Sequence, residues 1–410
     1  MRAPGNEPSM YKAPSALDNH DRTLVSGVGA CSALLGYVPS PTMTRRGSQE
    51  IATEQRATAA GTERFQRRFG EQFVEDFFRP LGGGLVASSI GIGTYLGECD
   101  DADDVTYAAA LRAALENGIN IIDSSVNYRC QRSERTVGLV LRDALADGIV
   151  KRDEVLVCTK GGYIPLDSSA PSTRDEYLSY LQRTFIDTGI VAADDVVGGG
   201  HALSPSFLAH QIQLSQTNLG VRTLDVYYLH NPEQQLDSVQ PARFRTILRR
   251  AFALLEERVA SGDIGCYGCA TWNGLRTAPD ARGHLDLAEL VGIARDVGGE
   301  DHHFRIVQMP VNLAMSEAVR TPTQRLGTRR VVPPLQAATE LGLSVVASAT
   351  LMQARLTTDL PAALRDTFPA LATDAQRAIA FVRSLPGVSS ALVGMRSLDH
   401  VSENIAAASR

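Results

Sequence analysis

Residues 101–123 read DADDVTYAAALRAALENG followed by INIID, and residues 133–159 repeat the design as SERTVGLVLRDALADG with EVLVCT after it. The first part of each stretch spaces apolar residues at a helical period and ends in glycine, which predicts a helix and its stop signal. The second part is a short, mostly apolar run, which predicts a buried strand. A helix therefore alternates with a strand in the part of the chain that decides the fold.

The same alternation extends in both directions from this stretch. Strands are predicted at SSIGIGT (88–94), TLDVYYL (223–229), IGCYGCA (264–270), FRIVQM (304–309), LSVVAS (343–348) and SALVG (390–394), each followed by a helical pattern. Uniform alternation predicts a parallel sheet. Eight strand-then-helix units fit a closed (β/α)₈ TIM barrel better than an open, doubly wound sheet.

The barrel domain is predicted to occupy residues 73–410, behind an extension of residues 1–72 that is largely disordered. Residues 1 to about 60 are rich in Pro, Ser, Thr, Ala and Gly and lack a sustained apolar period. The apolar patch at residues 24–38 is broken by glycines and preceded by Asp18 and Asp21, a poor secretory signal. We therefore expect a cytoplasmic protein.

Composition excludes several classes of function. A formal net charge of −6 argues against a nucleic-acid protein with a basic face. No apolar run reaches the roughly 18 residues of a membrane span, so no membrane partner is expected. Six cysteines in a long chain make neither a disulfide framework nor a zinc-ligand spacing, and no metal is expected. Cys266 and Cys269 form a C-x-x-C on a predicted strand, where the two thiols point to opposite faces and do not readily pair.

The segment GGGLVA at residues 82–87 matches the G-x-G-x-x-A of dinucleotide-binding folds. That motif must follow a strand and open a helix, whereas this one leads into the strand SSIGIGT. The favoured interpretation is a turn, such as a hairpin under the barrel floor.

Four polar residues follow consecutive predicted strands: Asp123 and Tyr128 after the second, Lys160 after the third and His230 after the fourth. Each alone is most often a helix cap, a packing residue, a solvated amine or a backbone partner. Together, at the carboxyl mouth of a barrel, they suit carbonyl reduction. A tyrosine holds its proton at neutral pH and can donate it to an alkoxide, a neighbouring ammonium favours the tyrosinate, and a carboxylate balances the lysine.

The chain resembles the aldo-keto reductase superfamily in a series of motifs that run in order from about Phe77 to the C-terminus. These motifs are GIGTYLG, INIIDSSVNYRCQRSERTVG, VCTKGG, DVYYLHNPE, YGCATWNG, VQMPVNL, SVVASATLMQARL and ALVGMRSLDHVSENIAA. The resemblance implies an NAD(P)H-dependent oxidoreductase acting on a small-molecule aldehyde or ketone, or on the alcohol in reverse. Asp123, Tyr128, Lys160 and His230 carry over as the catalytic tetrad, with Tyr128 as general acid.

The resemblance also implies a nicotinamide cofactor bound without a Rossmann domain, NADPH rather than NADH. The implied cofactor-binding residues are Gly93, Thr94, Thr271, Gln308, Ser348, Leu351, Arg355, Gly394, Arg396, Glu403 and Asn404. Ala270 and Thr271 replace the usual Ser-Asn pair, so we expect Thr271 to compensate for a lost carboxamide bond. Ser348 stands where a stacking aromatic often lies, and Gly394 replaces a lysine often paired with Arg396.

Two long loops are predicted at the mouth. The loop at 161–203 suggests a lid or binding loop, and that at 313–330 carries four arginines, interpreted as a solvated basic loop in preference to an anion site. Two other functions remain open from sequence. One is a nicotinamide-sensing accessory subunit resembling potassium-channel β subunits, and the other is a barrel with unrelated chemistry. Substrate identity and oligomeric state are not predicted.

Overall fold

A closed barrel of parallel strands lies at the centre of the computed structural model, which describes residues 55–410. Neighbouring strands pair in the order β11-β12-β3-β4-β5-β6-β7-β8, so each barrel strand lies beside the next one along the chain. The barrel strands are β3 (Ile90–Gly93), β4 (Ile121–Asp123), β5 (Leu156–Gly161), β6 (Leu224–His230), β7 (Ile264–Ala270), β8 (Phe304–Pro310), β11 (Ser344–Ser348) and β12 (Val388–Gly394). The predicted (β/α)₈ barrel is confirmed.

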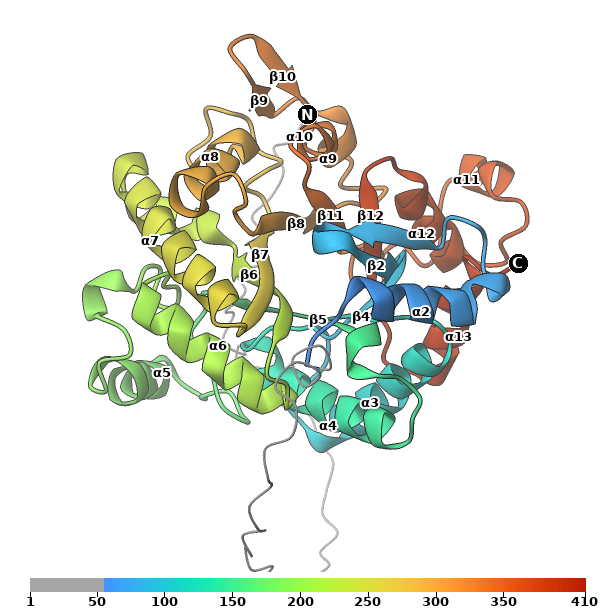
Figure 1. The fold of residues 1–410 in the computed structure, drawn as a ribbon, viewed down its shortest axis with the longest axis horizontal. Coiled ribbons are helices and arrows are strands. Elements are labelled where there is room, and N and C mark those ends of the chain that lie inside the picture. Colours follow the sequence, from blue (N-terminus) through green and yellow to red (C-terminus); the bar gives the residue numbers. More distant parts are fainter. Residues whose placement is uncertain (1–54) are drawn as a thin grey trace, which may run out of the picture.

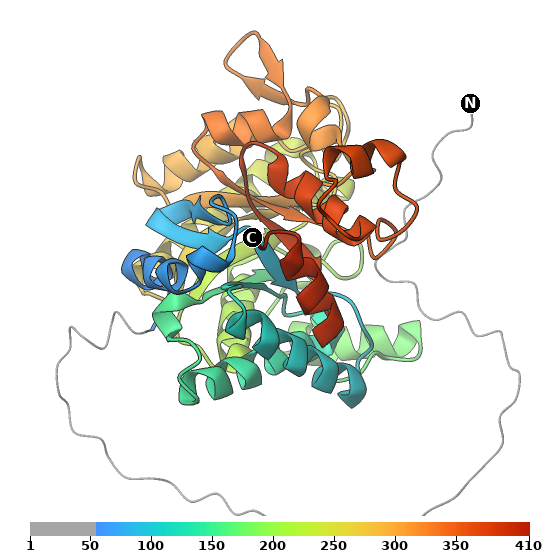
Figure 2. The same cartoon turned by 90° about the vertical axis from the view of Figure 1, so that its right-hand side faces the viewer.

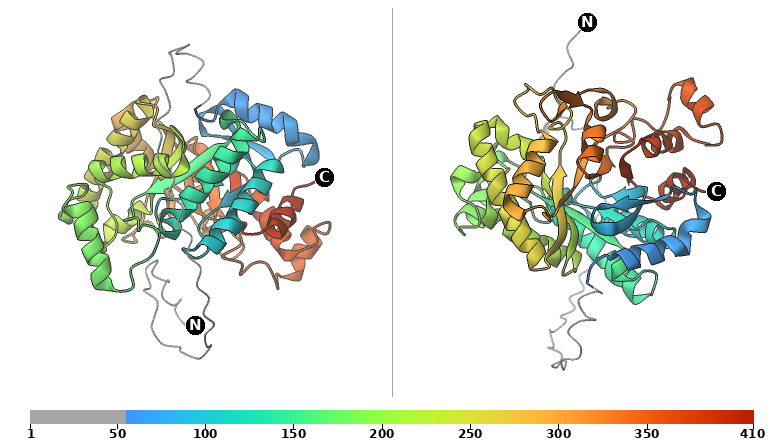
Figure 3. Two further views of the ribbon diagram at one scale, coloured as in Figure 1. Left: turned by 90° about the horizontal axis from the view of Figure 1, so that it is seen from below. Right: turned by 45° about the horizontal axis from the view of Figure 1, so that its top comes forward.

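Helices surround this barrel on all sides (Figures 1 and 3). They are α3 (Asp101–Glu116), α4 (Arg132–Ala146), α5 (Arg174–Leu181), α6 (Pro205–Leu219), α7 (Pro241–Ala260), α8 (Leu287–Gly298), α9 (Glu317–Arg320), α10 (Pro334–Glu340), α11 (Ala362–Thr367), α12 (Asp374–Ser384) and α13 (Leu398–Ala406). Asp100 caps α3 by accepting from the Asp103 amide, and the first turn of the helix is acidic.

The core has two layers. Inside the barrel, side chains such as Ile121, Val226 and Ile306 pack together, and a larger apolar layer lies between the strands and the helices. Cys266 belongs to the inner layer and Cys269 to the outer one, as expected for residues three apart on a strand. The C-x-x-C is therefore no redox pair.

A short hairpin closes the amino end of the barrel. Strands β1 (Phe78–Leu81) and β2 (Leu85–Ser88) pair antiparallel across Gly82–Gly84, where Gly83 and Gly84 have φ of 79° and 77°. Leu81 and Ala87 join the apolar layer inside the barrel. The hairpin interpretation of GGGLVA is confirmed, and Figure 2 shows the hairpin at one end of the barrel with α5 (light green) toward the other.

The structure of residues 59–72 differs from the prediction of a largely disordered extension over residues 1–72. They begin with helix α2 (Ala59–Phe69), capped by Thr58 and packed against the floor through the buried Phe65 and Phe69. Arg64 pairs with Asp153 and Glu154, just before β5. The stability of α2 comes from these tertiary contacts. A stretch with few apolar residues gives no local signal that such contacts will form. The predicted disorder of residues 1–54 lies outside the described residues.

Both long loops contain structure of their own. The 161–203 loop includes α5 and its own apolar cluster, to which Ile164, Phe185 and Phe207 of α6 belong. The 313–330 loop includes α9 and leads into the hairpin of β9 (Gln324–Leu326) and β10 (Arg330–Val332), which projects at the top of Figure 1. Arg330 pairs with Glu340, and the other three arginines of the loop are exposed, as expected of a solvated basic loop.

Candidate active site

Three neighbouring strands bring the predicted tetrad together at the carboxyl end of the barrel. Asp123 ends β4, Lys160 lies near the end of β5 and His230 ends β6. Tyr128 begins the turn Tyr128–Gln131 that connects β4 to α4. Since the strands are parallel and adjacent, residues at their ends meet at one rim.

A buried ion pair lies at the base of this site. Lys160 Nζ donates to Asp123 Oδ1 and, at 2.8 Å, to the carbonyl oxygen of Ser124. Burial alone would lower the pKa of Lys160, but Asp123 and Tyr128 together raise it. The other carboxylate oxygen of Asp123 accepts from Gln308 Nε2 at 2.8 Å. The amine is therefore held charged beside the Asp123 carboxylate.

The Tyr128 phenol lies against this ammonium. Lys160 Nζ is 4.9 Å from the centroid of the Tyr128 ring, and the edge of Tyr95 packs against the same ring at a centroid distance of 5.0 Å. Burial raises the pKa of Tyr128 to about 12, while the Lys160 charge acts in the opposite direction. The lysine has the direction of effect predicted from sequence, yet the phenol holds its proton more firmly than a free tyrosine does.

His230 completes the cluster as a neutral imidazole. Burial, the Lys160 charge and His201 hold the pKa of His230 well below its usual value. Its ring lies 5.8 Å from that of Tyr128 and 4.8 Å from that of Tyr163, both edge to face. It stays uncharged at neutral pH and can take part in hydrogen bonding to an oxygen without adding a second cation beside Lys160.

Sequence reasoning missed the residues that support His230. His201 Nε2 donates to the His230 carbonyl oxygen at 2.8 Å, and Ser125 Oγ lies 3.3 Å from His230 Nδ1. Tyr163 and His201 stand at the two ends of the 161–203 loop and pair through an isolated bridge. The ends of this loop therefore contact the site, whereas its middle packs on α6. Only the loop's length was a signal in the sequence.

The nicotinamide side of the predicted site is held by a different network. The carboxylate of Glu233, which follows β6, accepts from Thr271 Oγ1 at 2.5 Å and from the amides of residues 272, 273 and 274 at 3.0–3.2 Å. Thr271 Oγ1 also accepts from the Gly274 amide at 2.8 Å. The Thr271 hydroxyl is thus engaged within the protein and does not offer the free donor expected from sequence. Glu233 lies in the quoted motif DVYYLHNPE but was not singled out.

The remaining predicted cofactor residues are arranged along β8, β11, β12 and β3. Gly394 pairs in register with Gly93, and Gly93 with Asp123, which aligns three predicted residues across adjacent strands. Thr94 is buried and donates to the Asp123 carbonyl oxygen at 3.2 Å, a supporting contact. Ser348 ends β11, while Leu351 and the exposed Arg355 follow it.

The last predicted group lies just before α13 and within it. Arg396 is about half exposed and pairs with Asp103 of α3, at 3.0 Å from Oδ1. Glu403 is partly exposed and its carbonyl oxygen accepts from Gln376, while Asn404 is buried. The tetrad residues therefore contact one another, whereas Arg396 and Glu403 bind residues of α3 and α12.

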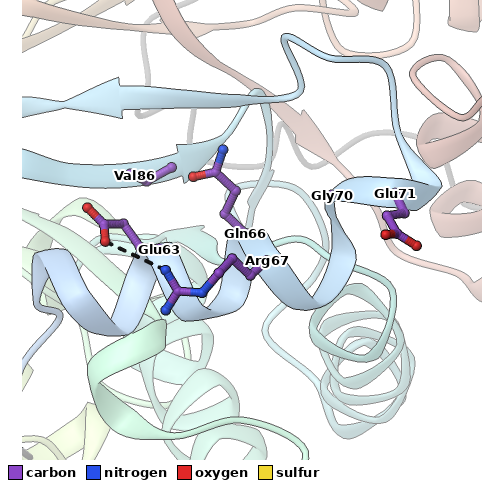
Figure 4. A pocket seen from close by; sticks show the side chains of 6 residues that line it. All are labelled: Glu63, Gln66, Arg67, Gly70, Glu71 and Val86. Carbon is purple, nitrogen blue, oxygen red and sulfur yellow. Dashed lines mark ion pairs between the residues drawn. The ribbon is translucent and has the colours of Figure 1, made fainter.

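A surface hollow lies elsewhere on the molecule, between α2 and β2 (Figure 4). Its lining residues are Glu63, Gln66, Arg67, Gly70, Glu71 and Val86, and Glu63 pairs with Arg67 at 3.8 Å. It lies at the amino end of the barrel, opposite the tetrad. Within residues 55–410 no group of three or more His, Cys, Asp or Glu side chains is placed to hold a metal ion, and no helix there is long and apolar enough to cross a bilayer.

The family model of the aldo/keto reductase family matches residues 89–359, the part of the chain that contributes the tetrad and most of the barrel. The chain belongs to the aldo/keto reductase family. Members of this family are oxidoreductases, and the motif resemblance is confirmed. A curated relative from Equus caballus, an aldo-keto reductase family 1 member C23-like protein, is 23% identical over 232 residues, 57% of this chain. That match spans about half of the relative, 52% of its length.

Solved structures of the family share the fold. An aldo/keto reductase from Klebsiella pneumoniae in complex with NADP and acetate has a TM-score of 0.54 at 22% identity, over 81% of this chain and 89% of its own. A holo-form aldo-keto reductase from Bacillus halodurans has a TM-score of 0.53 at 18% identity, over 80% of this chain and 90% of its own. At such identities the likeness shows the shared barrel fold alone.

Proposed function

We propose that this chain reduces the carbonyl of a small aldehyde or ketone to an alcohol with NADPH, or catalyses the reverse oxidation, with Tyr128 as the general acid. The observation that carries the proposal is the buried Asp123–Lys160 pair lying against a protonated phenol at the mouth of the barrel. Ion pairs with a purely structural role also occur in barrels. Such a role does not require a titratable phenol and a neutral imidazole beside the pair at the same rim.

Each residue has a distinct part in this chemistry. The Tyr128 phenol gives its proton to the carbonyl oxygen as negative charge develops there. The Lys160 ammonium stabilises the tyrosinate that remains, and Asp123 keeps the lysine charged. His230, held neutral, lies beside the same oxygen and orients it. A bound nicotinamide nucleotide supplies the hydride that no side chain can provide.

The residues on the far side of the mouth fit such a cofactor. Gln308 presents a buried amide beside Asp123, next to the proposed acid. The hydroxyl of Thr350, buried and next to Leu351, has no hydrogen-bond partner among the described residues. A Cβ built at Gly394 would meet no atom closer than 3.4 Å, which leaves room for a ligand beside β12. Gln308 would hold the carboxamide, and Leu351 and Arg355 would lie over the pyrophosphate.

NADPH is the proposed nucleotide because Arg396 and Arg355 are exposed cations suited to phosphate groups. Two structures of similar fold, both of Klebsiella pneumoniae aldo-keto reductases, are complexes with NADP or NADPH. The ion pair of Arg396 with Asp103 would have to open, or be shared, when a 2′-phosphate binds. We propose that Glu403 and Asn404 lie near the adenine end of the nucleotide.

Replacing Tyr128 with phenylalanine tests the assignment of the acid. Turnover of a carbonyl that the wild type reduces is expected to fall about 10²–10⁴-fold, with NADPH binding unchanged in fluorescence titration. Tyr180→Phe is the matched control: burial also raises the pKa of Tyr180 to about 12, but its hydroxyl donates to the Pro165 carbonyl oxygen, in the 161–203 loop. Equal turnover of wild type and Tyr128→Phe would refute the acid role. Tight NADPH binding without turnover of any carbonyl would favour the accessory-subunit function.

A further inference from the structure

Two cysteines face each other at the rim of the barrel, outside the tetrad. Cys99 lies in the loop from β3 to α3 and is partly exposed, whereas Cys130 is buried in the turn that starts at Tyr128. Their sulfur atoms are 3.0 Å apart, although the two residues lie 31 positions apart in the sequence. An approach of about 1 Å would bring them to the bonding distance of about 2.0 Å for a disulfide.

Arg129 holds Cys99 and Cys130 close together. Its guanidinium donates to the carbonyl oxygens of Glu98 at 2.7 Å and Asp100 at 3.2 Å, the residues on either side of Cys99. It also pairs with the Asp104 carboxylate at 2.6 Å. Because Cys130 directly follows Arg129, the contact that holds one cysteine's loop also places the other cysteine. Proximity is therefore built into the fold.

The backbone of the turn is itself held in an uncommon conformation. Arg129, Cys130 and Gln131 have φ values of 47°, 53° and 69°, in the left-handed region that non-glycine residues seldom adopt. The Cys130 carbonyl oxygen accepts from the Ser168 amide at 2.9 Å, and Gln131 Nε2 donates to the Leu166 carbonyl oxygen at 2.9 Å. Such strain persists only where surrounding contacts impose it. The turn is thus connected to the 161–203 loop as well as to the loop that carries Cys99.

We propose that Cys99 and Cys130 are an oxidisable dithiol that closes to a reversible disulfide when the protein meets a hydroperoxide. The Cys99 thiolate attacks one oxygen of the peroxide, and the O–O bond breaks as the S–O bond of a sulfenic acid forms. The other oxygen leaves and takes up a proton to give water or an alcohol. The Cys130 thiol then attacks that sulfur, the S–S bond forms and water leaves. Two thiols have lost two electrons and two protons, and one peroxide has been reduced. An external dithiol reverses the reaction.

The order of attack follows from exposure. Cys99 is the partly exposed sulfur and meets the oxidant first, while burial and the neighbouring Cys99 raise the pKa of Cys130 to about 12. The other described cysteines are buried in strands β5 and β7. A disulfide here would join the loop carrying Tyr95 to the turn carrying Tyr128, and so would stiffen the rim of the site. The dithiol itself does not depend on the proposed reductase function.

Peptide mapping of the full chain tests the proposal directly. A Cys31→Ser background removes the cysteine that lies outside the described residues. After treatment with hydrogen peroxide and blocking of free thiols, trypsin cleavage at Arg129 and Arg132 should release Cys130-Gln131-Arg132 bonded to the Cys99 peptide. The linked peptide should vanish after dithiothreitol and be lost in both Cys99→Ser and Cys130→Ser. Circular dichroism of the two variants confirms that they fold.

The readout is a mass, so it is separate from turnover and from the outcome of the Tyr128→Phe experiment. The proposal is overturned if both thiols of the folded protein are blocked singly after peroxide treatment. It is overturned as well if each is oxidised independently to the sulfinic acid, or if either is found bonded to a different cysteine.

Discussion

The two sides of the barrel mouth are built in different ways. On the β4–β6 side, the tetrad residues contact one another: Lys160 pairs with Asp123, and the Tyr128 ring lies against Lys160 and His230. On the β7–β12 side, groups predicted to hold a cofactor bind protein partners instead, as Thr271 does with Glu233 and Arg396 with Asp103. Strand register determines where the residues of the first side lie, whereas loops determine where those of the second side lie. The proposed catalytic geometry is therefore fixed in advance, whereas the proposed nucleotide binding would have to exchange existing contacts.

Removing the buried amine should have the largest effect on the tetrad side. Lys160→Met leaves the Asp123 carboxylate buried beside an apolar chain, and the free energy of unfolding should fall by about 3–5 kcal/mol. Carbonyl turnover should fall at least about 10²-fold. Urea denaturation and steady-state rates measure the two effects. The double variant Asp123→Asn/Lys160→Met should regain stability but not activity. Full activity in Lys160→Met would contradict the proposed role of the ammonium.

The next largest effect is expected at acid pH, where the buried His201 behind the tetrad should affect the stability of the fold. Burial lowers the pKa of His201 to about 4, below its usual 6.5, so the unfolded chain binds the extra proton first. The stability contribution of neutral His201 is full above about pH 6.5 and is lost as pH falls toward 4, on the order of 3 kcal/mol. His201→Gln should flatten the curve of unfolding free energy against pH over this window.

His400 supplies the control for that experiment, because His400→Gln removes an imidazole that lies exposed on α13. Its curve should match the wild type. An unchanged acid slope in His201→Gln would mean that another group controls the acid sensitivity.

The cofactor side should respond more weakly, beginning with Glu233. Glu233→Gln removes the charge that accepts from Thr271 and three amides, and the free energy of unfolding should fall by about 1–3 kcal/mol. NADPH binding should weaken while the pH dependence of turnover stays the same. Glu317→Gln, which breaks a half-exposed pair with Arg276, is the control and should change stability by less than about 1 kcal/mol. Wild-type stability of Glu233→Gln would show that the network is not needed.

The smallest effect is expected at the pair of the half-exposed Arg396 with the buried Asp103. Asp103→Asn frees Arg396 for a 2′-phosphate, and NADPH should bind up to about fivefold more tightly, since an ion pair open to solvent on one side is worth about 1 kcal/mol or less. NADH affinity should not change. Arg396→Ala should reduce the difference between the two nucleotides, as side-by-side titrations would show. An equal gain for NADH in Asp103→Asn would place Arg396 away from the 2′-phosphate.

Local patterns were enough to predict the barrel and the tetrad. Glycine-terminated helices and short apolar strands repeat along the chain, and strand ends bring Asp123, Lys160 and His230 to one rim without any knowledge of side-chain contacts. Helix α2 was missed because its anchor consists of two phenylalanines and ion pairs to a distant turn. The engagement of Thr271 by Glu233 was missed for a similar reason: both residues stood in quoted motifs, but only tertiary structure shows that they bind each other.

The floor hairpin has a consequence for how molecules enter and leave. Leu81 and Ala87 fill the amino end of the barrel, and α2 covers it from outside. In the proposed function, nucleotide, substrate and product would therefore share the carboxyl mouth of the barrel. A nucleotide lying across that mouth would have to bind before the substrate and leave after the product, so the closed floor favours an ordered sequence of binding in the proposed reaction.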